Sequence, residues 1–227
     1  QMNNGDTTRL RQKVIVEPIE THDYYPQDWP MDTIEELQAL VDQISKEVPE
    51  PDVVNLHLPA VTYEGGLFIG ERPMNFYGST ENGKRTTFTD TVQVAAQMGP
   101  INYFYDLDFV GDGSGIGLSS SARMWAENCS FTGWKTGVLG YGSVWVNVIS
   151  CRFEDNEIGF HFNSEGIYVS HSMFNDNLFL HNDTAVLLER VPTDVTMNFQ
   201  GSRFTGNGTD IDNRCNQPLH ISQAIFE

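Results

Sequence analysis

Basic residues are scarce in this chain, cysteines are few, and there is no long apolar run. Among its 227 residues there are 13 Lys and Arg against 31 Asp and Glu, which gives a formal net charge of −18. This shortage of cations argues against a nucleic-acid-binding surface and against docking on anionic lipid. No apolar run approaches the roughly 20 residues of a spanning helix, so we expect no direct membrane insertion by this chain. The acidic charge serves solubility, or it provides for Ca²⁺ or a cationic partner.

The three cysteines, Cys129, Cys151 and Cys215, are too few for a disulfide framework, and their spacing fits no zinc site. Cys129 and Cys151 are 22 residues apart and hold the same place in two successive repeats. Their side chains would point in parallel, which strains a bridge, so we expect buried, reduced thiols that pack as small hydrophobic groups. Cys215 falls in a turn.

What the chain does have is an internal repeat. The stretches "NCSFTGWKTGV" at residues 128–138 and "SCRFEDNEIGF" at residues 150–160 share an outline, in which Cys-x-Phe precedes a Gly and an apolar residue. Phenylalanines continue this spacing of about 22 residues, at Phe109, Phe131, Phe153, then Phe174 or Phe179, then Phe204 and Phe226. Both Phe174 and Phe179 fit, and we expect an inserted, bulging turn of five residues between them.

Between the phenylalanines, each repeat holds three short segments in which apolar and polar residues alternate, separated by turns rich in Gly, Asn and Asp. Alternation with period two indicates strands, and a period of 20–50 residues indicates a stacked architecture. Ile116, Val138 and Phe160 are aligned as one inward position. Equivalent residues of successive coils would stack about 4.8 Å apart, so only the inward positions must remain apolar.

A helix is expected at the N-terminal side of these coils, over residues 31–48. Ile34, Leu37, Val41 and Ile44 form one apolar stripe, Asp32 can cap the helix with Glu35 reaching back, and prolines follow its end. Residues 1–30 show no periodicity, and we interpret them as a linker or an arm that lies along the coil.

The stretch "VVNLHLPAVTYEGGLFIGERPMNFYGS" at residues 53–79 adds a strand, a turn and two further strands in a familiar order. With the repeat and the helix, it resembles the right-handed parallel β-helix proteins of the pectate-lyase-like superfamily. The resemblance covers residues 31–227. It implies an all-β, single-stranded right-handed parallel β-helix, with about 22 residues and three short strands per coil and an N-terminal capping α-helix.

Some members of this superfamily are enzymes, yet their catalytic residues do not carry over. The outward row expected to hold a site reads Gly117, Leu139, His161, Leu187 and Asp212, without the paired carboxylates that glycosidic cleavage needs. The stretch that corresponds to the first acidic motif of pectin methylesterases has Lys135 and Thr136 in place of the catalytic Asp. We therefore assign no catalytic residue. His161 could reach Glu189 as a surface pair.

Two groups are candidates for binding. Asp106, Asp108 and Asp112 are either turn residues or Ca²⁺ ligands. The outward residues Tyr103, Trp125, Glu127, Trp145 and Tyr168 either shield the sheet by stacking or contact a glycan or protein. No other cofactor is expected.

From these features we expect a non-catalytic, extracellular or cell-surface module that binds glycan or protein. One alternative is a polysaccharide-acting enzyme, a lyase or glycoside hydrolase, with its site built from turns. Another is the sensor or structural ectodomain of a longer anchored protein. The last coil, near Phe226, has no visible cap and could support oligomer formation.

Overall fold

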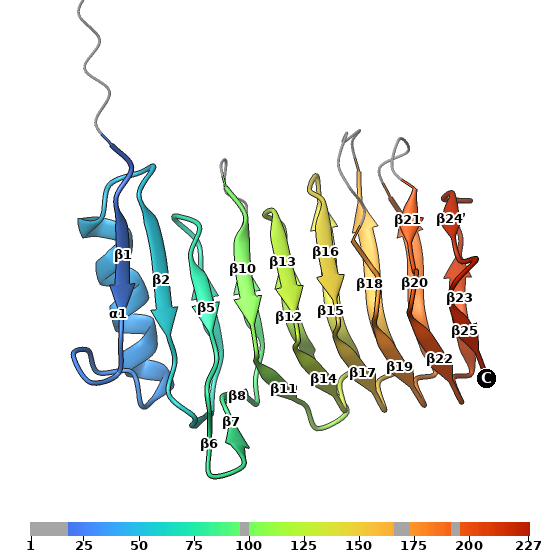
Figure 1. The fold of residues 1–227 in the computed structure, drawn as a ribbon, viewed down its shortest axis with the longest axis horizontal. Coiled ribbons are helices and arrows are strands. Elements are labelled where there is room, and N and C mark those ends of the chain that lie inside the picture. The colour runs from blue at the N-terminus through green and yellow to red at the C-terminus, as the bar shows by residue number, and fades with distance from the viewer. Residues whose placement is uncertain (1–17, 96–99, 166–172, 192–195) are drawn as a thin grey trace, which may run out of the picture.

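The computed structural model describes residues 18–95, 100–165, 173–191 and 196–227 of the chain. As predicted, these residues form a right-handed parallel β-helix with one helix near its N-terminal end (Figure 1). Successive coils contribute one strand to each of three parallel sheets, so residues about 22 positions apart in sequence lie side by side.

Sheet A has six strands: β1 (Thr21–Tyr24), β2 (Val53–His57), β5 (Asn75–Tyr77), β10 (Asn102–Tyr105), β13 (Met124–Glu127) and β16 (Val146–Ile149). Sheet B has eight: β3 (Thr62–Tyr63), β8 (Thr87–Phe88), β11 (Asp108–Val110), β14 (Ser130–Thr132), β17 (Arg152–Glu154), β19 (Leu178–Leu180), β22 (Arg203–Thr205) and β25 (Ile225–Phe226). Sheet C has seven: β4 (Leu67–Ile69), β9 (Val92–Val94), β12 (Ile116–Ser120), β15 (Thr136–Gly142), β18 (Ile158–Ser164), β20 (Thr184–Arg190) and β23 (Thr209–Asn213). Two smaller pairs are β21 (Met197–Asn198) with β24 (Leu219–His220), and the hairpin of β6 (Thr80–Glu81) and β7 (Lys84–Arg85).

The predicted helix is α1 (Ile34–Glu47), and its apolar face is buried at the N-terminal end of the coils. Its cap lies one residue later than we expected. The hydroxyl of Thr33 accepts a hydrogen bond from the amide of Glu36, whose carboxylate accepts from the amide of Thr33. The main-chain amide of Asp32, the predicted cap residue, also donates a hydrogen bond to the Glu36 carboxylate. The helix covers apolar core and sheet edge that would otherwise face solvent.

The part of residues 1–30 that the structure describes is integrated into the fold. Strand β1 pairs in parallel with β2 and extends sheet A by one strand beyond the first coil (Figure 1). The amide of Val53 donates to the carbonyl of Glu20, and Tyr24 packs against Trp29 with ring centroids 5.2 Å apart. This segment is thus a paired strand and no free linker.

The phenylalanine repeat is a continuous column of aromatic rings inside sheet B. Its neighbouring rings stack with centroids 4.7–5.5 Å apart. The column comprises Tyr63, Phe88, Phe109, Phe131, Phe153, Phe179, Phe204 and Phe226. All but the last are buried. Burial of each such ring contributes about 1.5–3 kcal/mol, so this column is the main apolar support of the coils.

Two details of the predicted register are wrong. Phe179, and not Phe174, continues the column, while Phe174 lies in the neighbouring inward row beside Phe199. The extra residues of that coil therefore precede Met173, and the predicted bulge between the two phenylalanines does not exist. In sheet C, Ile116 was predicted to align with Val138, but Leu118 pairs with Val138 and Ile116 pairs with Thr136. The shift arises because the turn at residues 111–115 is two residues longer than the equivalent turns of later coils.

Two of the three corners keep a common conformation over several coils. Between β10 and β22, one residue at each described corner from sheet A to sheet B has positive φ, and from β14 onward one residue at each described corner from sheet B to sheet C does. The first set is Asp106, Asn128, Ser150, Asp176 and Gly201, and the second is Gly133, Asp155, His181 and Gly206. The longer and more variable connections lead from sheet C to sheet A.

Candidate binding face on sheet A

The outer face of sheet A carries a continuous row of aromatic side chains. It begins at the end of β1 and crosses β2, β5, β10 and β13. We call it the aromatic row, and its members are Tyr25, His57, Tyr77, Tyr105, Tyr103 and Trp125. Parallel strands lie about 4.8 Å apart, so the row spans about 19 Å. It forms because alternate residues of each strand face outward in register.

The rings of the aromatic row stack mostly face to face. Neighbouring planes are inclined by only 4–15° from Tyr25 as far as Tyr103, with centroids 4.3–5.7 Å apart. Trp125 differs, since its ring is tilted by 45° to that of Tyr103 at 6.2 Å. The stacked rings therefore cover one another's faces and turn their edges to solvent, whereas the tilt of Trp125 leaves part of its face open.

Amides and carboxylates border the rings. The indole Nε1 of Trp125 donates to Glu127 at 3.0 Å, and Nε2 of His57 lies 2.9 Å from Oδ1 of Asp23. The amide group of Asn55 donates to Asp23 at 3.0 Å, and that of Asn75 donates to Asn55 at 2.9 Å. The outer face of sheet A thus combines apolar ring surface with a row of hydrogen-bonding groups, as ligand sites do.

Partial burial in the stack changes the acidity of the phenols. Desolvation, with a smaller contribution from neighbouring Tyr77, raises the pKa of Tyr105 to about 12. The pKa of Tyr77 is also raised, chiefly by burial. The hydrogen bond from His57 is the main cause of the lowered pKa of Asp23. At neutral pH Tyr77 and Tyr105 are therefore hydroxyl donors and acceptors, and Asp23 is a carboxylate.

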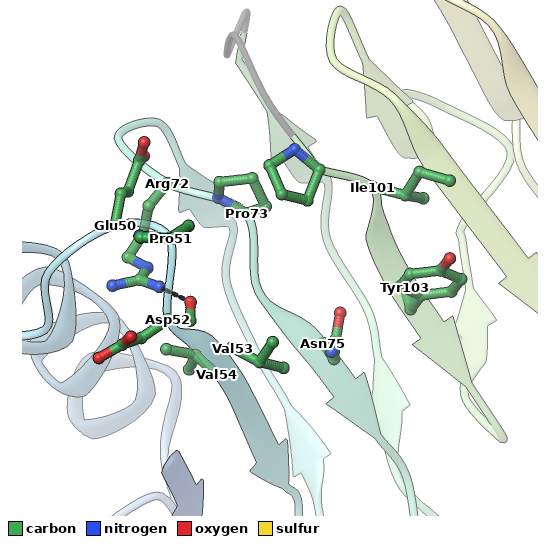
Figure 2. A pocket seen from close by; sticks show the side chains of 11 residues that line it. Glu50, Pro51, Asp52, Val53, Val54, Arg72, Pro73, Asn75, Ile101 and Tyr103 are labelled. Atoms are coloured by element: carbon green, nitrogen blue, oxygen red, sulfur yellow. Dashed lines mark hydrogen bonds between the residues drawn. The ribbon is translucent and has the colours of Figure 1, made fainter. Parts of the chain in front are cut away.

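A pocket adjoins the row where β2, β5 and β10 begin. Its volume is about 240 Å³. Figure 2 shows Pro51, Val53, Pro73, Ile101 and Tyr103 around it, with Asn75 on the strand between Val53 and Tyr103. Tyr103 and Asn75 belong both to the pocket and to the outer face. A ligand on the aromatic row could thus place one end in this mostly apolar hollow.

Arg72 forms the inner side of this pocket. It is only 3% exposed, and its guanidinium donates to the carbonyl groups of Val48, Pro49 and Asp52. These bonds tie the end of α1 to the start of β2. Arg72 therefore supports the pocket wall, and its charge is turned to the backbone.

Of the five predicted binding residues, the structure places three on the outer face of sheet A. Tyr103, Trp125 and Glu127 lie together on the outer face of sheet A, half-buried. Trp145 is only 4% exposed and packs against Phe162 and Phe174, so its prediction as a ligand contact is wrong. It precedes β16, where the chain turns the indole into the core. Tyr168 lies outside the described residues.

Sequence reasoning missed four members of the row: Tyr25, His57, Tyr77 and Tyr105. On these strands we had predicted Tyr103, Trp125 and Glu127, without following both outward positions through every coil. The second outward position of each strand, two residues later, holds Tyr105 and Glu127, and the same position in the first coils holds His57 and Tyr77. Alternation along each strand would have found them.

The three predicted Ca²⁺ ligands do not come together. Asp106 accepts from the side chain of Asn128, Asp108 accepts from the hydroxyl of Ser130 at 2.7 Å, and Asp112 accepts from Ser114 within its own turn. In the described ranges, three metal-ligating side chains converge only where β1 meets β2, at Glu20, His22 and Asp52.

The outward row of sheet C, in which we had sought catalytic groups, is largely apolar or paired. The shifted register makes Ser119, and not Gly117, its first member, followed by Leu139, His161, Leu187 and Asp212. As expected, His161 reaches Glu189, at 2.9 Å. Asp212 lies 2.8 Å from Arg214. Among the described residues of this row, His161 and Glu189 form a histidine–carboxylate pair, and no two carboxylates are held together.

The cysteines are as predicted, since all three are free and Cys129 and Cys151 are buried in adjacent coils. Burial, together with the neighbouring Cys151 thiol, raises the pKa of Cys129. The Cys129 thiol is therefore a protonated core group without nucleophilic character at neutral pH.

Comparison with known proteins agrees with the architecture. The family described as the right-handed beta helix region matches residues 76–224, which is most of the coil. No curated protein matches the chain in sequence. Over the described residues, no helix combines the length and the apolar character needed to cross a membrane.

Proposed function

The chain belongs to the right-handed β-helix family, and from that premise we propose that it is a non-catalytic module that binds oligosaccharides on the outer face of sheet A. The observation that carries this proposal is the aromatic row, which crosses five strands and adjoins a pocket at Tyr103. A regular row of hydroxyl, amide and ring groups suits a ligand that is itself a chain of similar units.

The chemistry of the face favours a neutral glycan. The outward positions of β1, β2, β5, β10 and β13 hold no Lys or Arg, while Asp23 and Glu127 are acidic. Sugar hydroxyls can exchange hydrogen bonds with the tyrosine hydroxyls and with the amides of Asn55 and Asn75. The open part of the Trp125 ring can meet the apolar face of a sugar. An anionic glycan would be repelled by the carboxylates.

Binding fits this face better than catalysis. Hydrolysis needs two carboxylates on either side of one glycosidic bond. Here Glu127 is held by the indole of Trp125, and Asp23 by His57 and Asn55. Such engaged groups orient a ligand more readily than they transfer protons.

Because long glycans are displayed mainly outside cells, the proposal includes an extracellular or cell-surface location.

The test is a panel of immobilised neutral and uronate oligosaccharides, read for binding and, in parallel, for new reducing ends and unsaturated products. We expect binding to neutral chains without cleavage, and at least about a tenfold loss for Trp125→Ala or Tyr105→Ala. Tyr141→Ala, on sheet C, is the matched aromatic control and should bind as the wild type does. Cleavage would instead establish the enzyme alternative, and wild-type binding by Trp125→Ala would remove the aromatic row as the site.

A further inference from the structure

Three side chains with metal-ligating atoms converge at the N-terminal edge of sheet A, away from the aromatic row. They are Glu20, His22 and Asp52, and the ligating atoms that they offer all lie within 4.8 Å of one another. Nε2 of His22 is 3.0 Å from Oδ2 of Asp52, while Oδ1 of Asp52 accepts a hydrogen bond from the amide of Glu20 at 3.1 Å.

The strand register explains why these residues meet although they are about 30 positions apart in sequence. Thr21 pairs with Val53 in the parallel β1–β2 ladder, which sets Glu20 beside Asp52. Glu20 and His22 are two residues apart on one strand, so their side chains leave the same face of it. The site is thus assembled from the N-terminal strand on one side and the first coil on the other.

The charges at this point favour a cation. The carboxylate of Glu20 has no hydrogen-bond or ion-pair partner among the described residues, and that of Asp52 has only His22 as an ion-pair partner. The nearby guanidinium of Arg72 is bonded to the main-chain carbonyl of Asp52 and to two others, so its hydrogen bonds go to the backbone and none to these carboxylates. The site therefore offers two carboxylate groups and an imidazole nitrogen as ligands.

We propose that Glu20, His22 and Asp52 bind one divalent ion of the Zn²⁺ type and that this ion clamps β1 to the first coil. Imidazole combined with carboxylates suits Zn²⁺ and similar transition metals, whereas Ca²⁺ prefers oxygen ligands alone. Zn–N and Zn–O bonds of about 2.0–2.2 Å in a tetrahedral site place neighbouring ligand atoms about 3.4 Å apart. The His22–Asp52 spacing of 3.0 Å needs to widen only slightly to reach this, and the exposed Glu20 side chain can turn in as the third ligand.

Metal uptake tests the site. The metal-free full chain is titrated with Zn²⁺ by calorimetry, and bound zinc is measured after dialysis. We expect one equivalent for the wild type and at least about a tenfold weaker affinity for His22→Gln and for Asp52→Asn. His161→Gln is the matched control, because His161 also lies 2.9 Å from a carboxylate but belongs to no group of three ligands. Wild-type affinity in His22→Gln, or no stoichiometric uptake by the wild type, would overturn the site.

Hydrogen exchange tests the clamp. The amide of Val53 donates to the carbonyl of Glu20 and reports on opening of β1. If opening breaks the site, free Zn²⁺ at about nine times its Kd should slow this exchange about tenfold in the wild type and leave it unchanged in Asp52→Asn. Circular dichroism verifies that each variant is folded. Stoichiometric zinc uptake without slower exchange would overturn the clamp while leaving the ion site.

Discussion

At the scale of single residues, the corners of the coil impose the most specific demand. Ser150 has a φ of 52° and is exposed, in a row in which Gly201 fills the same place two coils later. A non-glycine residue in this left-handed conformation is disfavoured by about 1–2 kcal/mol, and glycine avoids that cost but loses more chain entropy on folding. Serine at this corner is therefore tolerated and not optimal.

We predict that Ser150→Gly raises the free energy of unfolding by about 0.5 kcal/mol, whereas Ser150→Val lowers it by about 1–2 kcal/mol, because a β-branched side chain is strained at positive φ. Urea unfolding of the two variants and the wild type measures both changes. Equal stability of the glycine and valine variants would show that the corner does not hold this conformation in solution.

Titration of the Tyr105 phenol makes the free energy of unfolding depend on pH in alkaline solution. Its pKa is raised by burial to about 12, from about 10 in an unfolded chain, so the folded state favours the neutral phenol. Its contribution to stability is complete below pH 10 and is lost as the pH rises from about 10 to about 12. Tyr105→Phe should remove this part of the alkaline decline in unfolding experiments. It should also remove one group from the late phase of phenolate absorbance, and an unchanged late phase would contradict the assignment.

At the scale of elements, a column of buried asparagines holds the corner between sheets B and C. Asn182 donates to the carbonyl of Phe153 and to the side chain of Asn207, and its own carbonyl accepts from Asn156. Asn156, Asn182 and Asn207 each donate to a main-chain carbonyl of the preceding coil, and the first two also donate to the asparagine of the next coil. This satisfies polar groups that the tight turn leaves without a sheet partner.

We predict that Asn182→Ala lowers the free energy of unfolding by about 3 kcal/mol, since it leaves buried polar groups of Phe153 and Asn156 without partners. The neighbouring exposed Asp183→Ala should change it by less than about 0.5 kcal/mol. Chemical denaturation of both variants gives the comparison, and similar values for the two would remove the column as a stabilising element.

The cap of α1 offers a second element-scale prediction. Thr33→Ala breaks the reciprocal hydrogen bonds with Glu36 and should lower the free energy of unfolding by about 1 kcal/mol. Asp32→Ala, at the cap position that the sequence favoured, should cost less than half as much. The same denaturation assay distinguishes them, and a larger effect at Asp32 would restore the sequence-based cap.

The repeat, the fold and the helix could be predicted because each depends on periodic apolar positions. The register could not be predicted throughout, since turns of unequal length separate the strands: Phe174 and Phe179 both fit by counting, and only pairing of Phe153 with Phe179 decides. Trp145 was misplaced for a similar reason. It stands just before a strand, where alternation no longer determines whether a side chain faces the core or solvent. The Glu20–His22–Asp52 group needed the β1–β2 pairing, which joins distant segments without any sequence repeat.

At the scale of the whole molecule, the charge of −18 is spread over a protein whose coils contact mainly their neighbours. Like charges in successive coils are separated by a few strand spacings of about 4.8 Å each. This separation does not exceed the electrostatic screening length, which is about 30 Å at 0.01 M salt. We predict that the free energy of unfolding increases when NaCl is raised from about 0.01 to about 0.15 M, because screening reduces this repulsion. A thermal unfolding series measures it, with sucrose as an uncharged solute. A decrease with salt would mean that attractive ion pairs outweigh the repulsion.

The unequal corners also govern how such a chain can change over evolutionary time. From β10 to β17, the corner from sheet A to sheet B keeps two residues in every coil, one of them in the left-handed conformation. The connections from sheet C to sheet A differ in length from coil to coil, at the rim beside the aromatic row and the pocket, while the corner from sheet A to sheet B carries an extra element, the β6–β7 hairpin, only before β10. Descendants of one ancestral coil can thus acquire new loops around the same face while the rest of the barrel-like stack stays constant. Ligand choice can then vary through the loops between sheets C and A, while the short corners between the other sheets keep the scaffold constant.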